Sequence, residues 1–114
     1  MKIINQSRGT VLADDVVIAD TPVRRITGLL NKTSLPQGQA LVIKPCNSIH
    51  TFFMRFAIDV IFADKKGKIV GLKKNIGPFK ISPIYWKANF VVELPAGTLD
   101  QTNTALGDNL ALAP

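Results

Sequence analysis

The hydrophobic positions of this chain come mostly in short runs with the period of β-strands. Residues 57–63 give the strongest such signal, because β-branched and aromatic residues fill both of its alternating faces. Ile58, Val60 and Phe62 form one face, and Asp59 shares the other face with apolar residues. A strand that is apolar on both faces is usually covered on both sides. The pattern therefore predicts a buried strand that carries a shielded carboxylate at Asp59.

Further strands are predicted by short apolar runs that turn residues delimit. The expected strands are residues 40–44, 68–76, 90–94 and 110–112, with two more inside residues 1–19 around a turn at residues 7–9. A turn at residues 64–67 should join the strongest strand to its partner. Short strands in this number, separated by turn signals, suggest a β-sandwich or a partly open barrel.

One short amphipathic helix is expected among these strands, and it should begin at Pro22. Thr21 can cap free backbone amides, and proline suits the first helical position because its missing N–H would have no partner there. Apolar residues recur at helical spacing as far as Leu30, which predicts that Arg24 and Arg25 face outward. We expect this helix to pack over a sheet.

The composition fits one globular domain that covers residues 1–114. The chain has 114 residues, 46% hydrophobic and 19% charged, which allows a core without disulfides. The lone Cys46 cannot form an internal disulfide, which is typical of a reducing compartment. No apolar run at the start resembles a signal peptide, and none is long enough to span a membrane. We therefore expect a cytoplasmic protein with no membrane partner.

The positive charge is concentrated in one stretch of the chain. The formal net charge is +6, and residues 65–87 contain seven lysines and no acidic residue. Such a cluster can bind phosphates, or it can simply keep a hairpin face solvated and blunt a sheet edge. The cluster lacks arginine and aromatic residues at strand spacing, so a nucleic-acid partner is not favoured. The oligomeric state is left open.

A loop of three aromatic residues follows the lysine-rich hairpin. Phe79, Tyr85 and Trp86 lie where Pro78 and Pro83 interrupt any regular strand or helix. Exposed rings there would form a stacking lip for a sugar or a base, whereas buried rings would pin the loop onto the core.

The candidate chemistry lies in residues 45–59, beside a block of large apolar side chains. This segment contains the only cysteine and the only histidine of the chain, together with a cation and a carboxylate. A buried carboxylate without donors is costly, so Asp59 should have partners. The candidate donors are His50, Arg55, Arg24 and Arg25. Glu93 interrupts a second apolar strand, and if the two strands are neighbours, both carboxylates line one polar pocket. The predicted ligand-binding residues are Cys46, His50, Arg55, Asp59 and Glu93.

Several functions are compatible with this cluster. The leading interpretation is a small-ligand binding or accessory module with a polar pocket near His50 and Asp59. One alternative is an enzyme, a hydrolase or transferase, in which Asp59, Glu93 or His50 acts as acid or base. Another is a basic interaction module that uses the lysine-rich hairpin. The polar groups can also be a structural network that fixes strand register.

Cys46 and His50 suggest two more specific possibilities, a nucleophile–base pair and a zinc site. A nucleophile and its base must lie within hydrogen-bond reach, and on a regular strand these residues would be about 13 Å apart unless a turn brings them together. A structural zinc site usually has four ligands with paired spacing, and the chain has one cysteine and one histidine. We therefore expect no metal and no other cofactor.

Several segments together resemble one known family. Residues 46–62 closely resemble the central motif of the family named domain of unknown function 192. The other matching segments are residues 25–30, 67–70, 93–97 and 107–108. Leu30 and Ala57 stand where the family often has methionine and proline, and both replacements are apolar. The resemblance covers nearly the whole chain. It implies a prokaryotic protein with a small, mostly-β fold of sandwich or jelly-roll-like character and a helix, and it implies no activity.

Overall fold

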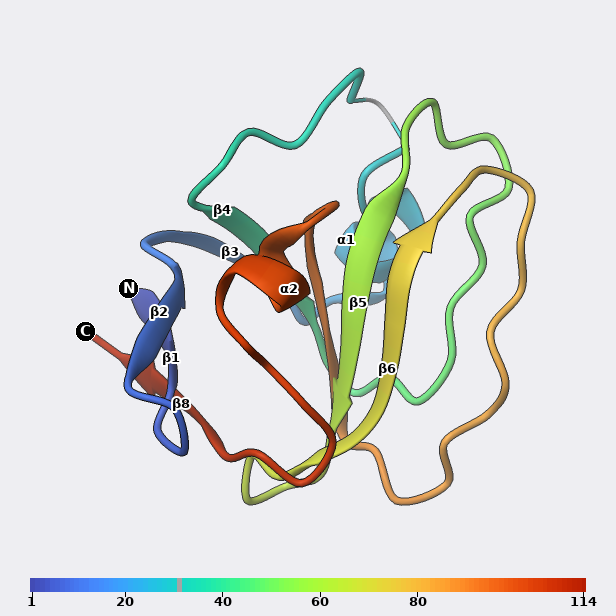
Figure 1. Cartoon of the computed structure of the whole chain (residues 1–114). Helices are drawn as coiled ribbons and strands as arrows, with labels where there is room; N and C mark the ends of the chain where they lie inside the picture. The colour runs from blue at the N-terminus through green and yellow to red at the C-terminus, as the bar shows by residue number, and fades with distance from the viewer. Residues whose placement is uncertain (31) are drawn as a thin grey trace.

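The computed structural model describes residues 1–30 and 32–114, which form two packed β-sheets with two short helices (Figure 1). The strands are β1 (Lys2–Asn5), β2 (Thr10–Ala13), β3 (Asp15–Ala19), β4 (Gln39–Ile43), β5 (Ile58–Ala63), β6 (Ile69–Ile76), β7 (Phe90–Pro95) and β8 (Leu110–Ala113), and the helices are α1 (Pro22–Thr27) and α2 (Thr98–Gln101). The larger sheet has the order β3-β4-β7-β5-β6 and the smaller has the order β2-β1-β8. Neighbouring strands are antiparallel, except that β3 and β4 run parallel.

The larger sheet is covered on both faces, which produces two apolar layers. One layer lies between the sheets and contains Ile3, Leu12, Val42, Ile61, Val92, Leu94 and Leu110. The other lies on the outer face of the larger sheet and contains Leu29, Ile43, Ile49, Met54, Val60, Phe62 and Val91. All six residues of β5 are buried between these layers. The predicted mostly-β, two-layer fold is confirmed, and the described strands close no barrel.

The N-terminal segment contains three strands rather than the two expected. Strands β1 and β2 pair as an antiparallel hairpin, with Gly9 in the connecting turn at φ 69°. The chain then leaves the smaller sheet, because the backbone N–H groups of Asp14 and Asp15 both donate to the carbonyl of Gly38 at 2.9 and 3.0 Å. These bonds bring β3 alongside β4 in the larger sheet. The sequence shows Asp14 and Asp15 between two apolar runs here, and it does not show that the second run joins another sheet.

Helix α1 begins where the sequence predicts and ends earlier. Thr21 Oγ1 accepts a hydrogen bond from the backbone N–H of Arg24 at 3.2 Å, and Pro22 occupies the first turn. The helix ends at Thr27, not near Leu30, because Gly28 follows it at φ 47°. Val23, expected on the buried face, is 74% exposed. The helix is therefore one short cap over the edge of the outer layer.

The second helix, α2, was not predicted, because its four residues are too few to show a helical period. It follows Gly97, whose φ of 95° turns the chain sharply after β7. Neither described helix has the length and hydrophobicity needed to cross a lipid bilayer.

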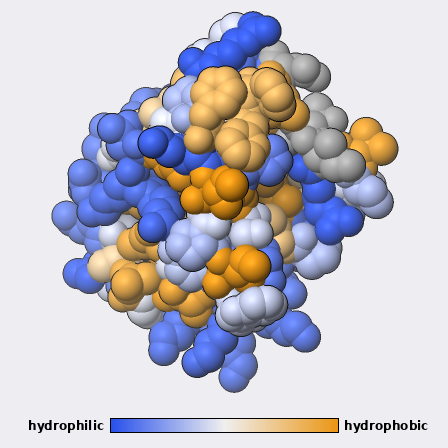
Figure 2. Space-filling model, turned by 90° about the vertical axis from the view of Figure 1, so that its right-hand side faces the viewer, coloured by the Kyte–Doolittle hydropathy of each residue, from blue (hydrophilic) through white to orange (hydrophobic). Residues whose placement is uncertain are grey.

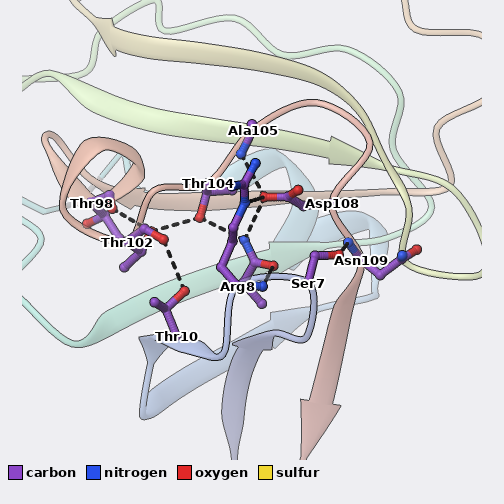
Figure 3. Close-up of polar contacts among 10 residues, drawn as sticks. Ser7, Arg8, Thr10, Thr98, Thr102, Thr104, Ala105, Asp108 and Asn109 are labelled. Carbon is purple, nitrogen blue, oxygen red and sulfur yellow. Dashed lines mark hydrogen bonds and ion pairs between the residues drawn. The ribbon is translucent and has the colours of Figure 1, made fainter.

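A buried polar cluster ties β1 to the segment that precedes β8 (Figure 3). Asn5 Nδ2 donates to Thr104 Oγ1 at 3.2 Å and to Asp108 Oδ2 at 3.0 Å. Asp108 Oδ2 also accepts from Arg8 Nε at 3.1 Å and from the backbone N–H of Ala105 at 2.9 Å. The hydrogen bond from Asn5 is the main reason that the pKa of Asp108 lies below its usual value. The cluster has a structural role, since three donors from different segments converge on Asp108 Oδ2.

The three aromatic residues of the β6–β7 connection behave differently from one another. The Tyr85 ring packs on Phe62 with a centroid distance of 4.2 Å, and it lies so close over Gly71 that a β-carbon there would overlap it. Tyr85 therefore pins the loop onto the outer layer. Phe79 and Trp86 are 63% and 81% exposed, so they stay candidates for contacts with a partner.

Candidate functional site

A cavity of about 590 Å³ lies on the outer face of the larger sheet. Its walls come from α1, the segment that follows α1, the end of β4 and the β4–β5 connection. The apolar part of the lining includes Leu29, Leu30, Ile43, Ile49, Phe53 and Met54, and the polar part includes Arg25, Cys46, Ser48, His50 and Glu93. The cavity is thus a mostly apolar chamber with a few polar groups, which is the usual composition of a small-molecule site.

Glu93 contributes the most unusual of these polar groups. It lies on β7 opposite Val60 of β5, so its side chain shares the outer face with Val60. The residue is 5% exposed, and its Oε2 has no hydrogen-bond partner within residues 1–30 and 32–114. Burial raises the pKa of the Glu93 carboxyl to about 7, because the charged form loses its hydration. The carboxyl is therefore poised to exchange its proton near neutral pH.

Arg25 supplies a donor to the same cavity. Its Nη1 donates to the carbonyl of Pro45 at 3.3 Å, which ties α1 to the start of the β4–β5 connection. Its Nε is buried and has no hydrogen-bond partner in the part of the chain that the structure describes. The sequence predicts that Arg25 faces outward, and this is wrong for Arg25, whereas Arg24 is exposed as expected. The helix ends one turn earlier than predicted, and Arg25 lies in its last turn beside the cavity.

Cys46 and His50 both line the cavity, but the structure does not pair them as nucleophile and base. Cys46 Sγ donates to the carbonyl of Ser48 at 3.0 Å, and His50 Nδ1 accepts from the backbone N–H of Phe52 at 3.3 Å. Desolvation raises the pKa of the Cys46 thiol, and the charge of Glu93 adds to that rise. A thiol in this environment stays protonated, which disfavours a role as a nucleophile. His50 is exposed at the mouth and stacks on Phe52.

Asp59 lies on the opposite face of the sheet from Glu93. It is opposite Leu94 in the β5–β7 pair, one position out of phase with the pair of Val60 and Glu93. The expectation that the two carboxylates line one pocket is therefore wrong, because adjacent register positions point to opposite faces.

Backbone groups, not cations, satisfy the buried Asp59 carboxylate. Its Oδ1 accepts from the backbone N–H of Asn75 at 2.8 Å. Its Oδ2 accepts from the backbone N–H groups of Gly97 at 3.1 Å and Leu99 at 2.9 Å. The predicted shielding is confirmed, since Asp59 is 1% exposed. None of the side chains proposed as donors is among the hydrogen-bond partners found for Asp59 in residues 1–30 and 32–114.

The structure thus brings together three of the five predicted site residues and separates the other two. Cys46, His50 and Glu93 line the cavity. The Asp59 side chain lies on the other face of the sheet, and the exposed Arg55 is not part of the lining. Arg25 joins the site although the sequence offered it only as a partner for Asp59. One sequence signal could have indicated its role. Arg25 lies four residues before Leu29, and the apolar helical period places Leu29 against the sheet.

Comparisons with known proteins support the assignment of the fold, and the matching family model and sequence relatives name no activity. The family model DUF192, described as "Uncharacterized ACR", matches residues 3–112. A UPF0127 protein of Thermococcus sibiricus is 32% identical over 112 residues, which are 95% of this chain and 72% of that protein. The UPF0127 protein PH1112 of Pyrococcus horikoshii is 31% identical over 113 residues, 95% of this chain and 96% of that protein.

A solved structure shares the fold at lower sequence identity. A protein of unknown function from Novosphingobium aromaticivorans superposes with a TM-score of 0.83 at 17% identity, over 97% of this chain and 82% of that one. Prokaryotic relatives and a small mostly-β domain were both predicted, and both are confirmed.

Proposed function

The chain belongs to the DUF192 family of uncharacterised proteins, and on that premise we propose that it binds a small amphipathic molecule in the cavity between α1 and the larger sheet. The observation that carries this proposal is a pair of buried polar atoms in the lining of one cavity, Glu93 Oε2 and Arg25 Nε, which have no hydrogen-bond partner among the described residues. An unmet buried donor or acceptor costs about 1–3 kcal/mol, so proteins rarely keep one without a use. A bound ligand would satisfy both atoms.

The lining indicates the chemical class of the ligand. The leucine, isoleucine, methionine and phenylalanine side chains of the walls favour an apolar body, and the volume of about 590 Å³ is in the range of small-molecule sites. Arg25 offers a donor, while Glu93 offers a donor when protonated and an acceptor when ionised. The matching head group is therefore a carboxylate or a carboxamide, which can accept from both residues while Glu93 is protonated.

The enzyme alternative is weaker on this geometry. Asp59 would have been one of its acids or bases, and both oxygens of Asp59 are engaged by backbone N–H groups on the other face of the sheet. Acid–base chemistry would then rest on Glu93 and the exposed His50 alone. A binding site needs only the cavity and its polar anchors, so we favour binding.

A cytoplasmic location is part of the same proposal. Cys46 is a free thiol that lines the cavity. A reducing compartment keeps such a thiol from being oxidised, and oxidation would place a bulky polar group among the apolar walls.

Octanoate and octanamide test this proposal, because they share one alkyl chain and differ in head group. Isothermal titration calorimetry should detect saturable binding of both compounds to the wild-type protein. Octanoate should bind about tenfold more weakly at about pH 8 than at about pH 6, because ionised Glu93 repels its carboxylate above a pKa near 7. Octanamide, which is neutral, should show a much smaller change with pH.

Matched variants assign the effect to the cavity. Glu93→Gln should remove the pH dependence of octanoate binding while leaving binding itself intact. Arg25→Ala should weaken octanoate binding about tenfold, whereas Arg24→Ala, a change of the neighbouring exposed arginine, should have no effect. If neither compound binds saturably, or if the two arginine variants weaken octanoate binding equally, this site is excluded.

A further inference from the structure

Two connections at one end of the β5–β6 hairpin carry an exposed apolar patch. The patch consists of Phe52 and Phe53, which precede β5, with Phe79 and Ile81, which follow β6. Phe53, Phe79 and Ile81 are 75%, 63% and 70% exposed. Figure 2 looks onto the side of the molecule where these connections run, and there hydrophobic residues gather at one end with hydrophilic residues around them. Exposed apolar residues that are grouped in this way usually mark an interaction surface.

The backbone holds this patch in a fixed shape. The N–H of Thr51 donates to the carbonyl of Lys80 at 2.8 Å, and the N–H of Phe79 donates to the carbonyl of Thr51 at 3.0 Å. Thr51 Oγ1 adds bonds to the carbonyl of Gly77 at 2.6 Å and from the N–H of Lys80 at 2.9 Å. The two connections therefore form one unit, and the patch does not have to order itself before it binds.

Two of the phenylalanines have a backbone conformation that bulky residues avoid. Phe53 and Phe79 have φ values of 65° and 60°. This left-handed region costs an ordinary residue roughly 1–2 kcal/mol, and such strain is typical of functional loops. The two rings meet edge to face at a centroid distance of 6.1 Å, and both remain largely in solvent. The chain thus bears this strain at a pair of outward rings that contribute little to the core.

The charges around the patch indicate which kind of partner it fits. Arg55 and Lys80 are exposed next to the aromatic residues, and no acidic residue occurs in residues 21–58 or 65–92. A second copy of the chain would bring like charges together, since the net charge is +6. Peptide-binding sites are usually grooves or open sheet edges, whereas these rings project from loops. Projecting aromatic residues beside basic ones fit the headgroup region of an anionic bilayer.

We propose that Phe52, Phe53, Phe79 and Ile81 insert into the headgroup region of an anionic membrane surface while Arg55 and Lys80 contact its acidic lipids. The sequence predicts no membrane partner because no segment can span a bilayer, and docking on the surface needs no such segment. Phe53 and His50 also line the cavity, so docking would bring the cavity mouth to the lipid. The docking itself does not depend on the proposed ligand.

Vesicle co-sedimentation tests the docking surface. The wild-type protein should sediment with phosphatidylcholine vesicles that contain phosphatidylserine, and much less with phosphatidylcholine alone. Phe53→Asn with Phe79→Asn should reduce that binding about tenfold or more, because the apolar insertion is lost while asparagine tolerates the left-handed backbone. Lys80→Glu with Arg55→Glu should also reduce it about tenfold or more. Circular dichroism melting should show that each variant is folded.

Two matched controls make the test specific. Lys65→Glu with Lys66→Glu makes the same charge change in the β5–β6 turn, at the opposite end of the hairpin, and should retain most of the binding. Leu106→Asn removes an apolar residue that is 64% exposed and lies outside the patch, and it should bind as the wild type does. If the two double charge reversals reduce binding equally and the phenylalanine variant leaves it unchanged, the binding is unspecific charge attraction, and the proposal is overturned.

Two other results would also overturn the proposal. One is the absence of binding to either vesicle type. The other is a wild-type dimer in sedimentation velocity that the phenylalanine variant dissociates, which would make the patch an interface between copies. Failure of octanoate binding would leave the vesicle result unaffected, so the two proposals are tested separately.

Discussion

Asp59 and Glu93 are two buried carboxylates on adjacent strands, and the structure treats them in opposite ways. They are 1% and 5% exposed. Asp59 faces the layer between the sheets and accepts three backbone hydrogen bonds. Glu93 faces the outer layer, and its Oε2 accepts no hydrogen bond from any residue that the structure describes. The same kind of group at similar burial is therefore a structural anchor on one face and a candidate binding group on the other.

The comparison shows that burial of a charge does not by itself indicate a site. The useful observation is whether the buried oxygens have partners, because a satisfied carboxylate stabilises the fold and an unsatisfied one costs free energy. Asp59 fixes the position of α2 and of the bulged end of β6, whereas Glu93 is available to a ligand. Substitutions at the two positions should therefore have effects of opposite sign.

The largest effect is expected for Asp59→Ala. It leaves the backbone N–H groups of Asn75, Gly97 and Leu99 without an acceptor, and bonds to a charged acceptor are the stronger ones. We expect the free energy of unfolding in urea to fall by about 4 kcal/mol.

Asp59→Asn is the matched control for this change. It keeps one oxygen for Gly97 and Leu99 and places an NH₂ group against the N–H of Asn75, so its cost should be smaller. A loss below about 1 kcal/mol for Asp59→Ala would mean that the anchor contributes little to stability.

A somewhat smaller effect of opposite sign is expected for Glu93→Gln at alkaline pH. The pKa of Glu93 is about 7 in the folded protein against 4.5 for the free side chain. The folded state therefore binds more protons between these values, and stability falls as the pH rises through them. The total loss is about 3 kcal/mol, present in full above neutral pH.

The pH series isolates this contribution from the other carboxyl groups. The difference in free energy of unfolding between Glu93→Gln and the wild type should grow from low pH to about pH 8, in favour of the variant. A difference that stays constant with pH would mean that Glu93 is not buried in its charged form, and would remove the contrast with Asp59.

The sequence predicts the strands well, because alternation and turn residues are local signals. It also predicts that Asp59 is shielded, since the apolar residues on both faces of residues 57–63 are visible along the chain. It does not predict the partners of Asp59, because backbone N–H groups have no sequence signature, and Gly97 and Leu99 come from a connection about 40 residues away.

The candidate site is harder to predict than the fold, because it depends on strand register. The face of Glu93 follows from its pairing with Val60, and a shift of one residue would put it beside Asp59. The role of Arg25 depends on where α1 ends and how it packs, and Gly28 sets that end through its positive φ. These features arise from tertiary contacts that no local pattern contains.

Asp108 is a third buried carboxylate and extends the comparison to the smaller sheet. It is 6% exposed, and its Oδ2 accepts from two side chains and one backbone N–H. Asp108→Asn should lower the free energy of unfolding by about 2 kcal/mol at neutral pH, because hydrogen bonds to a charged acceptor are lost.

The pH dependence distinguishes Asp108 from Glu93. The pKa of Asp108 lies below its usual value, so its contribution is present at neutral pH and disappears as the pH falls through the folded-state pKa. The cost of Asp108→Asn in urea unfolding should therefore shrink in acid. If the cost persists unchanged in acid, the hydrogen bonds to the charged form of Asp108 do not stabilise the fold in the way that those to Asp59 do.

The smallest effect tests whether Asp59 depends on the backbone of its donors and not on their side chains. Asn75 donates through its N–H while its φ is 51°, next to the irregular pairing at the start of β5. Asn75→Gly keeps this conformation accessible and should leave stability within about 0.5 kcal/mol, whereas Asn75→Ala should cost about 1 kcal/mol, because alanine disfavours positive φ. Urea unfolding of both variants in the Asp59→Ala background should show a much smaller difference, since the bond that requires this geometry is then absent. If the difference between the two Asn75 variants is undiminished, the left-handed conformation of residue 75 is maintained for another reason. Asp59 then accepts the hydrogen bond from Asn75 without determining that conformation.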